Sequence, residues 1–203
     1  MEEQNKKQQI IISVGREFGS GGHEISEKLS EIFGIELYDK NILEHIAELK
    51  NVNVADYEKY DEVPRNLVFS RKVKGFSNSM EENIANIQFN YLKKKAEEGE
   101  SFVVVGRCAE TVLKQYPALV SIFVLSDWDA KVKRIMRIYG LSEKDAESYI
   151  TRKDRKRREY HNYYCDIKWG DSRNYDISIN SSKLGEEETA KMLAEYVKKR
   201  RGL

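Results

Sequence analysis

Runs of apolar, β-branched residues alternate with helix-spaced patterns along the chain. The first apolar run covers residues 10–14 and gives way to glycine-rich residues 15–22. Apolar residues then recur every three to four positions, at Ile25, Leu29 and Ile32, which is the spacing of a helix. Four further runs are typical of strands, at 34–40, 101–106, 120–125 and 175–180.

The segments between these runs predict helices. They lie at 41–50, 76–98, Asp127 to Arg137, Ser142 to about Tyr160, and 186–200. Asp127 and Ser142 are residue types that cap helix N-termini. Residues 51–75 are polar and weakly periodic, and no element is assigned to them. Strands that alternate with helices predict an α/β fold with a five-stranded parallel sheet in one domain, because parallel strands need crossover connections.

The strand, glycine-rich loop and helix come in the order that builds a phosphate-binding turn. Glycines let backbone N–H groups approach an anion, and the helix N-terminus adds positive potential. The usual motif, G-x-x-x-x-G-K-[ST], has a lysine after its last glycine. Here Gly22 occupies that position and His23 follows it. The loop therefore predicts phosphate binding and leaves catalysis open.

Ligands of parallel sheets bind at the carboxyl ends of the strands. This rule places Gly15–His23, Asp39 and Gly106–Arg107 on one rim. Asp39 could accept a proton, hold magnesium through water or cap the helix that follows. Arg107 is either a ligand cation or a surface arginine at a strand end.

Other cations lie on the predicted helices. Arg134 and Arg137 have i, i+3 spacing, as have Arg152 and Arg155 in the basic run 152–158. Such pairs either face a ligand or belong to a solvated helix face. We interpret residues 142–165 as a lid over the phosphates, and a nucleic-acid patch is the alternative.

Composition excludes several classes of protein. The chain has 203 residues and a net charge of +1, so no overall field favours nucleic acid or a membrane. Neither a signal peptide nor a membrane span is indicated, and two cysteines suit a reduced cytoplasm. No histidine has a cysteine partner at metal-ligand spacing, so we expect no zinc site and interpret Cys108 as structural.

Several motifs together resemble the cytidylate kinase-like family of P-loop nucleoside monophosphate kinases. They are SVGREFGSGGHEISEKLSEIFG, LYDK, VVVGRCAE, the basic segment and WGDSRNYDISINSSKLG. The resemblance implies a doubly wound P-loop sheet with a helical lid, and transfer of phosphate from ATP, with Mg²⁺, to an acceptor such as CMP. It implies that the donor phosphates lie on Gly15, Gly19, Ser20, Gly21, Gly22 and His23. Asp39 and Arg107 would face the acceptor, with Arg152 and Arg155 in the lid.

The chain departs from cytidylate kinases proper at three positions. Gly22 replaces a lysine, Cys108 replaces an aspartate, and Lys156 replaces an acidic lid residue. We expect a cytoplasmic small-molecule kinase in which Arg16, or a lid arginine, substitutes for the lysine, with His23 as second candidate. The rival interpretation is a nucleotide-binding regulatory protein without catalysis. Oligomeric state and acceptor are left open.

Overall fold

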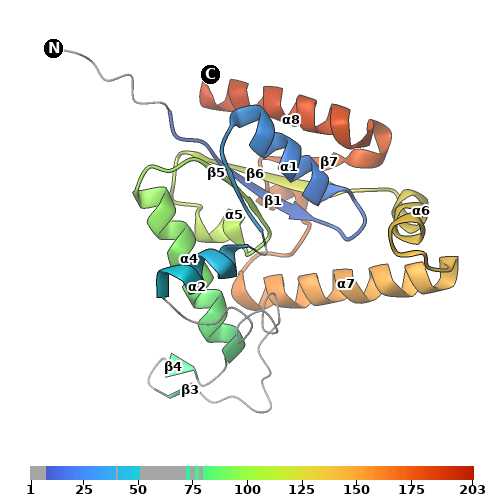
Figure 1. The fold of residues 1–203 in the computed structure, drawn as a ribbon, viewed down its shortest axis with the longest axis horizontal. Coiled ribbons are helices and arrows are strands. Elements are labelled where there is room, and N and C mark those ends of the chain that lie inside the picture. The colour runs from blue at the N-terminus through green and yellow to red at the C-terminus, as the bar shows by residue number, and fades with distance from the viewer. Residues whose placement is uncertain (1–7, 40, 51–71, 74–75, 78–79) are drawn as a thin grey trace.

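The computed structural model describes residues 8–39, 41–50, 72–73, 76–77 and 80–203, and its core is a parallel sheet (Figure 1). The strands are β1 (Ile11–Arg16), β2 (Glu36–Tyr38), β5 (Phe102–Val105), β6 (Leu119–Leu125) and β7 (Ile177–Asn180). Their order is β2-β5-β1-β6-β7, and every neighbouring pair is parallel. The predicted five-stranded α/β fold is confirmed.

Helices connect these strands on both faces of the sheet. They are α1 (Gly22–Phe33), α2 (Ile42–Lys50), α4 (Met80–Glu97), α5 (Ala109–Val112), α6 (Trp128–Tyr139), α7 (Glu143–Tyr164) and α8 (Gly185–Arg201). The helix predicted from residue 76 is wrong in its first turn, because β4 (Phe76–Ser77) pairs there with β3 (Lys72–Val73). Most of the unassigned segment 51–75 lies outside the described residues.

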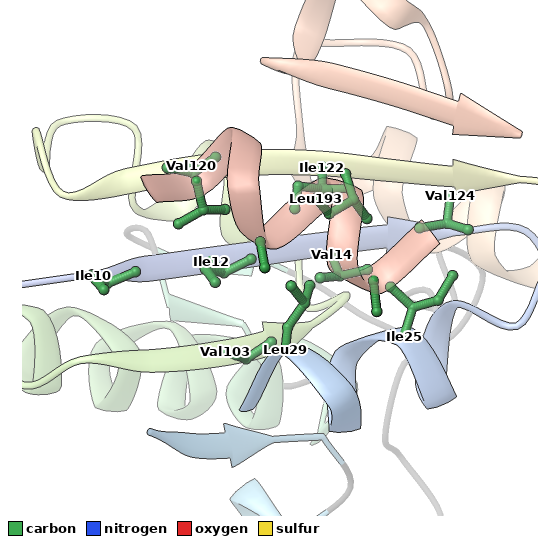
Figure 2. Packing of buried hydrophobic residues seen from close by; sticks show 13 residues of the cluster. Ile10, Ile12, Val14, Ile25, Leu29, Val103, Val120, Ile122, Val124 and Leu193 are labelled. Atoms are coloured by element: carbon green, nitrogen blue, oxygen red, sulfur yellow. The ribbon is translucent and has the colours of Figure 1, made fainter. Parts of the chain in front are cut away.

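The central strand β1 is buried along its whole length, which explains why apolar residues occupy both of its faces, at Ile11, Ile12 and Val14. Ile12 and Val14 pack with Leu29 of α1 and Leu193 of α8 on one face (Figure 2). Ile11 belongs to the cluster on the other face, which includes residues of α2, α4 and α5. The sheet is therefore held rigidly between two apolar layers, and its strand ends form a fixed platform.

Helix α7 lies across two of these strand ends. The hydroxyl of Ser142 accepts a hydrogen bond from the N–H of Asp145 at 3.2 Å, as the predicted cap requires. Midway along α7, Asp154 bonds Phe18 in the loop after β1. Near its end, His161 bonds Glu110, which follows β5. Across the part of the chain that is described, none of the helices combines the length and apolar character that a membrane span requires.

Candidate functional site

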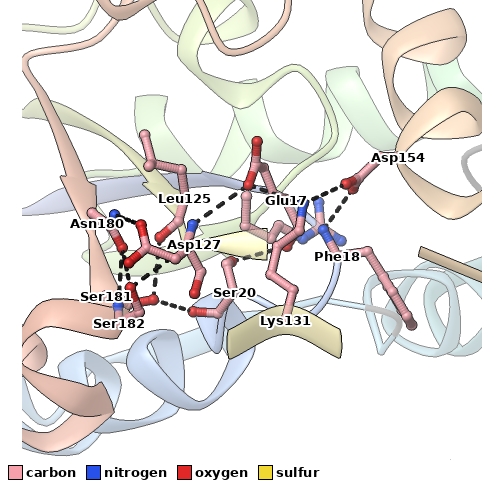
Figure 3. A network of polar contacts seen from close by, with 12 residues as sticks. Glu17, Phe18, Ser20, Leu125, Asp127, Lys131, Asp154, Asn180, Ser181 and Ser182 are labelled. Carbon is pink, nitrogen blue, oxygen red and sulfur yellow. Dashed lines mark hydrogen bonds and ion pairs between the residues drawn. The ribbon is translucent and has the colours of Figure 1, made fainter. Parts of the chain in front are cut away.

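The glycine loop joins β1 to α1 and is held by polar contacts to three distant segments (Figure 3). Gly19 and Gly21 adopt left-handed backbone conformations, with φ of 81° and 76°. The hydroxyl of Ser181 donates to the Ser20 carbonyl at 2.6 Å. The N–H of Phe18 donates to Asp154 at 2.6 Å. The loop is thus preformed, with a helix N-terminus directly behind it.

Glycine is required at position 21 by a neighbouring side chain as well as by the backbone. A Cβ atom on Gly21 would lie 2.7 Å from Cγ of Glu186, at the start of α8. The Glu186 carboxylate pairs with Arg134 of α6. A larger residue at position 21 would therefore disturb this ion pair besides changing the loop.

Position 22 has no room for a side chain, because Arg16 fills the space. A Cβ atom there would lie 2.6 Å from Cβ and 3.0 Å from Cγ of Arg16. With Gly21 as the last glycine of the usual motif, Gly22 stands at the lysine position and Arg16 stands at the first glycine. The glycine and the cation have exchanged places across the loop.

The predicted rim brings His23, Asp39 and Arg107 together. Nδ1 of His23 lies 3.0 Å from the Asp39 carboxylate, and a guanidinium nitrogen of Arg107 lies 3.7 Å from its other oxygen. Arg107 also donates to the Asp39 carbonyl at 3.1 Å and is only 2% exposed. The hydrogen bond with Asp39 raises the pKa of His23, against the opposing effect of partial burial.

Arg107 lies in a strained turn. Arg107 and Cys108 have φ of 57° and 53°, directly after Gly106 at 74°. Non-glycine residues in this region cost about 1–3 kcal/mol each and tend to cluster at functional sites. The turn points the Arg107 guanidinium inward, toward Asp39.

A pocket lies beside the loop, and three arginines line it: Arg16, Arg107 and Arg157. The rest of its wall comprises Gly15, Gly106, Cys108, Glu110, Tyr160, His161, Trp169 and Tyr175. Arg157, on α7, donates to the Arg16 carbonyl at 3.4 Å and lies over the ring of Phe18. Guanidinium groups on three elements suit an anionic ligand such as a phosphate.

The lid arginines singled out from the sequence lie on the other side of α7. The Arg155 side chain is 67% exposed and lies 3.9 Å from Glu159. Arg152 is exposed and covers Tyr149. Both line an outer groove with Trp128. Burial of Ile150 and Asp154 fixes the rotation of the helix, so it is Arg157 that faces the pocket.

Lys131 is a buried cation near the loop that the sequence analysis did not identify. Its ammonium lies 3.0 Å from Asp154 and 3.1 Å from Glu17, and its side chain is 5% exposed (Figure 3). Because Asp154 also accepts the N–H of Phe18, this network ties α6 and α7 to the loop. No local signal marks Lys131, since its partners are 23 and 114 positions away.

The two arginines predicted on α6 have different surroundings. Arg134 is ion-paired with Glu24 of α1 and Glu186 of α8, and its side chain is 13% exposed. Arg137 is exposed. The structure therefore does not bring this pair together on a ligand-facing surface, and Arg134 acts as a link between three helices.

A second group of chemically active side chains adjoins the pocket, whose wall includes Cys108, Glu110 and His161. His161 Nε2 is 2.6 Å from Glu110 Oε1, and Cys165 and Cys108 adjoin them. Burial disfavours the imidazolium, but hydrogen bonds with Cys165 and Glu110 raise the pKa of His161 to about 10. The hydrogen bond from Cys108 lowers the pKa of Cys165 to about 6. The expectation that no histidine has a ligand-type partner is wrong for His161.

Comparisons with known proteins agree with this architecture. The model of the cytidylate kinase-like family matches residues 11–183. The cytidylate kinase of Pyrococcus horikoshii is 25% identical over 186 residues, which are 89% of this chain and 84% of that protein.

Solved structures show the same fold. An uncharacterized protein from Eubacterium ventriosum has 40% sequence identity and a TM-score of 0.74, covering 93% of this chain and 98% of its own. Shikimate kinase from Bacteroides thetaiotaomicron has 12% identity and a TM-score of 0.54, with 93% and 98% coverage, and is alike in fold alone. The sheet order, the glycine loop after β1 and the family match over residues 11–183 lead to one conclusion: this chain belongs to the cytidylate kinase-like family of P-loop kinases.

Proposed function

We propose that this protein transfers a phosphoryl group from ATP to a nucleoside monophosphate of the CMP type, or to a related small acceptor. The observation that carries the proposal is the pocket beside the glycine loop, which Arg16, Arg107 and Arg157 line. Phosphoryl transfer depends mainly on positioning and on neutralising negative charge, and the three arginines that line the pocket would supply both. Family membership supports the reaction class.

The glycine loop is the proposed donor site. Backbone N–H groups of residues 19–23, including those of Ser20 and His23 at the start of α1, would hold the ATP phosphates. Arg16 takes the role of the missing lysine, because its side chain occupies the space beside Gly22 and lines the pocket. His23, with its raised pKa, adds partial positive charge at the helix start.

The acceptor side is formed by the rim and by α7. Arg107, held by Asp39, would grip the acceptor's phosphate, and Arg157 would neutralise charge between acceptor and donor. We propose residues 142–165 as the lid, with Arg157 as its phosphate-facing arginine. Arg152 and Arg155 contact phosphate only if α7 rotates on closing, because both now line the outer groove.

Magnesium is the expected companion of ATP. Carboxylates near the loop already pair with protein cations: Asp39 with His23 and Arg107, and Glu17 and Asp154 with Lys131. These residues do not form a carboxylate cage for the ion. Mg²⁺ commonly binds through substrate phosphates, so we propose that it enters with ATP.

The test is phosphoryl transfer from γ-labelled ATP to a panel of nucleoside monophosphates and small hydroxyl acceptors, with ATP binding measured in parallel by calorimetry. Transfer to one acceptor class, lost in Arg107→Ala, supports the proposal. The glycine at position 22 favours a second candidate, a nucleotide-binding regulatory protein. ATP binding without transfer to any acceptor would support that candidate and refute the kinase.

A further inference from the structure

A buried cluster of metal-ligating side chains joins the start of α5 to the end of α7. Ligand atoms of Glu110, His161 and Cys165 all lie within 4.8 Å of one another. Each of these residues is only 5–6% exposed. Cys108, which is 3% exposed, belongs to the same buried cluster as Cys165 and adds a second sulfur.

Ligand atoms of Glu110, His161 and Cys165 lie close enough for one zinc ion to reach all three after small side-chain shifts. Zinc bonds of about 2.0–2.3 Å place neighbouring ligand atoms roughly 3.4–3.8 Å apart. The 2.6 Å contact of His161 Nε2 with Glu110 Oε1 would have to widen by about 1 Å when an ion replaces the shared proton. Cys165 caps the C-terminus of α7, and its N–H donates to the His161 carbonyl at 2.8 Å, so both residues lie in the last turn at the end of this helix.

The kind of donors selects the metal. Two sulfurs, one imidazole nitrogen and one carboxylate oxygen suit zinc, whereas magnesium and calcium prefer oxygen donors alone. Burial of an acid and an imidazole is costly unless they are paired or bound to a metal. The low exposure of these residues is typical of a structural zinc site, in which protein ligands fill every coordination position.

We propose that Cys108, Glu110, His161 and Cys165 bind one zinc ion. The ion would pin the end of α7 to the turn that carries Arg107, since Cys108 directly follows that arginine. Cys108, Glu110 and His161 also line the pocket beside the glycine loop, so the ion would adjoin the proposed phosphate site and fix the base of the proposed lid whichever acceptor the protein uses.

The test titrates the full chain, stripped of metal under reducing conditions, with zinc chloride against a chromophoric chelator. We expect one zinc per chain and protection of both thiols from a thiol-reactive dye. Cobalt(II) serves as the spectroscopic probe, with thiolate-to-cobalt charge transfer and intense tetrahedral d–d bands expected. Neither readout depends on kinase activity.

Variants locate the ion. Loss of even an outer-shell partner costs about 10- to 100-fold in metal affinity, so Cys165→Ser and His161→Ala should each weaken binding by more than ~100-fold. Tyr160→Phe, beside the cluster in the same apolar group, is the matched control and should bind zinc as the wild type does.

Circular dichroism shows whether the variants fold, and the wild-type cobalt spectrum decides the question if they do not. The proposal is overturned if the wild type takes up no stoichiometric zinc or shows no thiolate band. Equal affinity in the folded ligand variants would also overturn it, as would a Cys108–Cys165 disulfide forming in place of metal uptake.

Discussion

Restoring the usual motif by exchanging residues 16 and 22 should test how the glycine loop works. Gly22→Lys alone places a Cβ atom 2.6 Å from Cβ of Arg16, which is closer than real side chains approach. Such overpacking costs about 1–3 kcal/mol, so this variant should be less stable and less active. Arg16→Gly alone empties the space beside residue 22 and removes the proposed cation.

Loss of one well-placed charge stabiliser lowers turnover by roughly 10²- to 10³-fold, or about 3–4 kcal/mol in the barrier. We expect a loss of this size for Arg16→Gly. The double variant Arg16→Gly/Gly22→Lys should recover most of it, because the new lysine enters the space that the arginine leaves. The two changes should therefore be strongly non-additive, as contacting residues are.

The assay is single-turnover phosphoryl transfer from ATP, with unfolding midpoints for all four proteins and calorimetry for ATP affinity. Arg200→Ala, an exposed arginine near the end of α8, is the control for simple loss of positive charge and should leave transfer unchanged. A double variant no more active than the product of the two single effects would refute the exchange. An Arg16→Gly variant as active as the wild type would refute the role of Arg16 itself.

Three further predictions concern the rim and α7. Asp39→Asn should lower the pKa of His23, measured by NMR titration, because Asp39 raises that pKa in the wild type. The ion pair therefore stabilises the fold fully below about pH 6.5, and this stabilisation is lost as the pH rises through the pKa of His23 in the folded state. An unchanged titration curve would contradict the pairing. Arg157→Ala should reduce turnover by ~10-fold or more in steady-state kinetics, and Arg155→Ala should have a smaller effect, because of these two arginines only Arg157 lines the pocket. A larger loss of turnover in Arg155→Ala than in Arg157→Ala would show that α7 turns on closing. Asp154→Asn should lower the free energy of unfolding by about 1–3 kcal/mol, because it weakens the hydrogen bonds of Asp154 with the buried ammonium of Lys131 and with the N–H of Phe18. An unchanged midpoint of urea unfolding would exclude that contribution.

The sequence by itself determined the sheet and the position of its ligand-binding edge. The strand at 10–14 is apolar at Ile10, Ile12 and Val14 and also at Ile11 on the opposite face, and such a run is stable only with both faces covered. Its alternation with helical segments indicated parallel strands, and the carboxyl-end rule brought Asp39 and Arg107 to the loop. The spacing of apolar residues and the residues that end strands and helices are local patterns, so they can be read from a single sequence.

Tertiary structure decided which charged side chains face the site. The i, i+3 spacing of Arg152 and Arg155 showed that they share a face of α7, but the rotation of that helix is set by burial of Ile150 and Asp154. This rotation turned Arg157 toward the pocket. A run of basic residues does not indicate which of them face the pocket, because each of these side chains is equally suited to solvent.

Contacts between distant segments were likewise invisible in the sequence. Lys131 meets Glu17 across 114 positions, and His161 meets Glu110 across 51. The sequence showed that position 22 lacks the usual lysine, but only the packing showed that Arg16 fills the space beside Gly22. Hydrophobic periodicity indicates which residues face the core. Which residues contact one another there depends on how segments distant in the sequence are brought together, and this is decided only when the helices pack on the sheet.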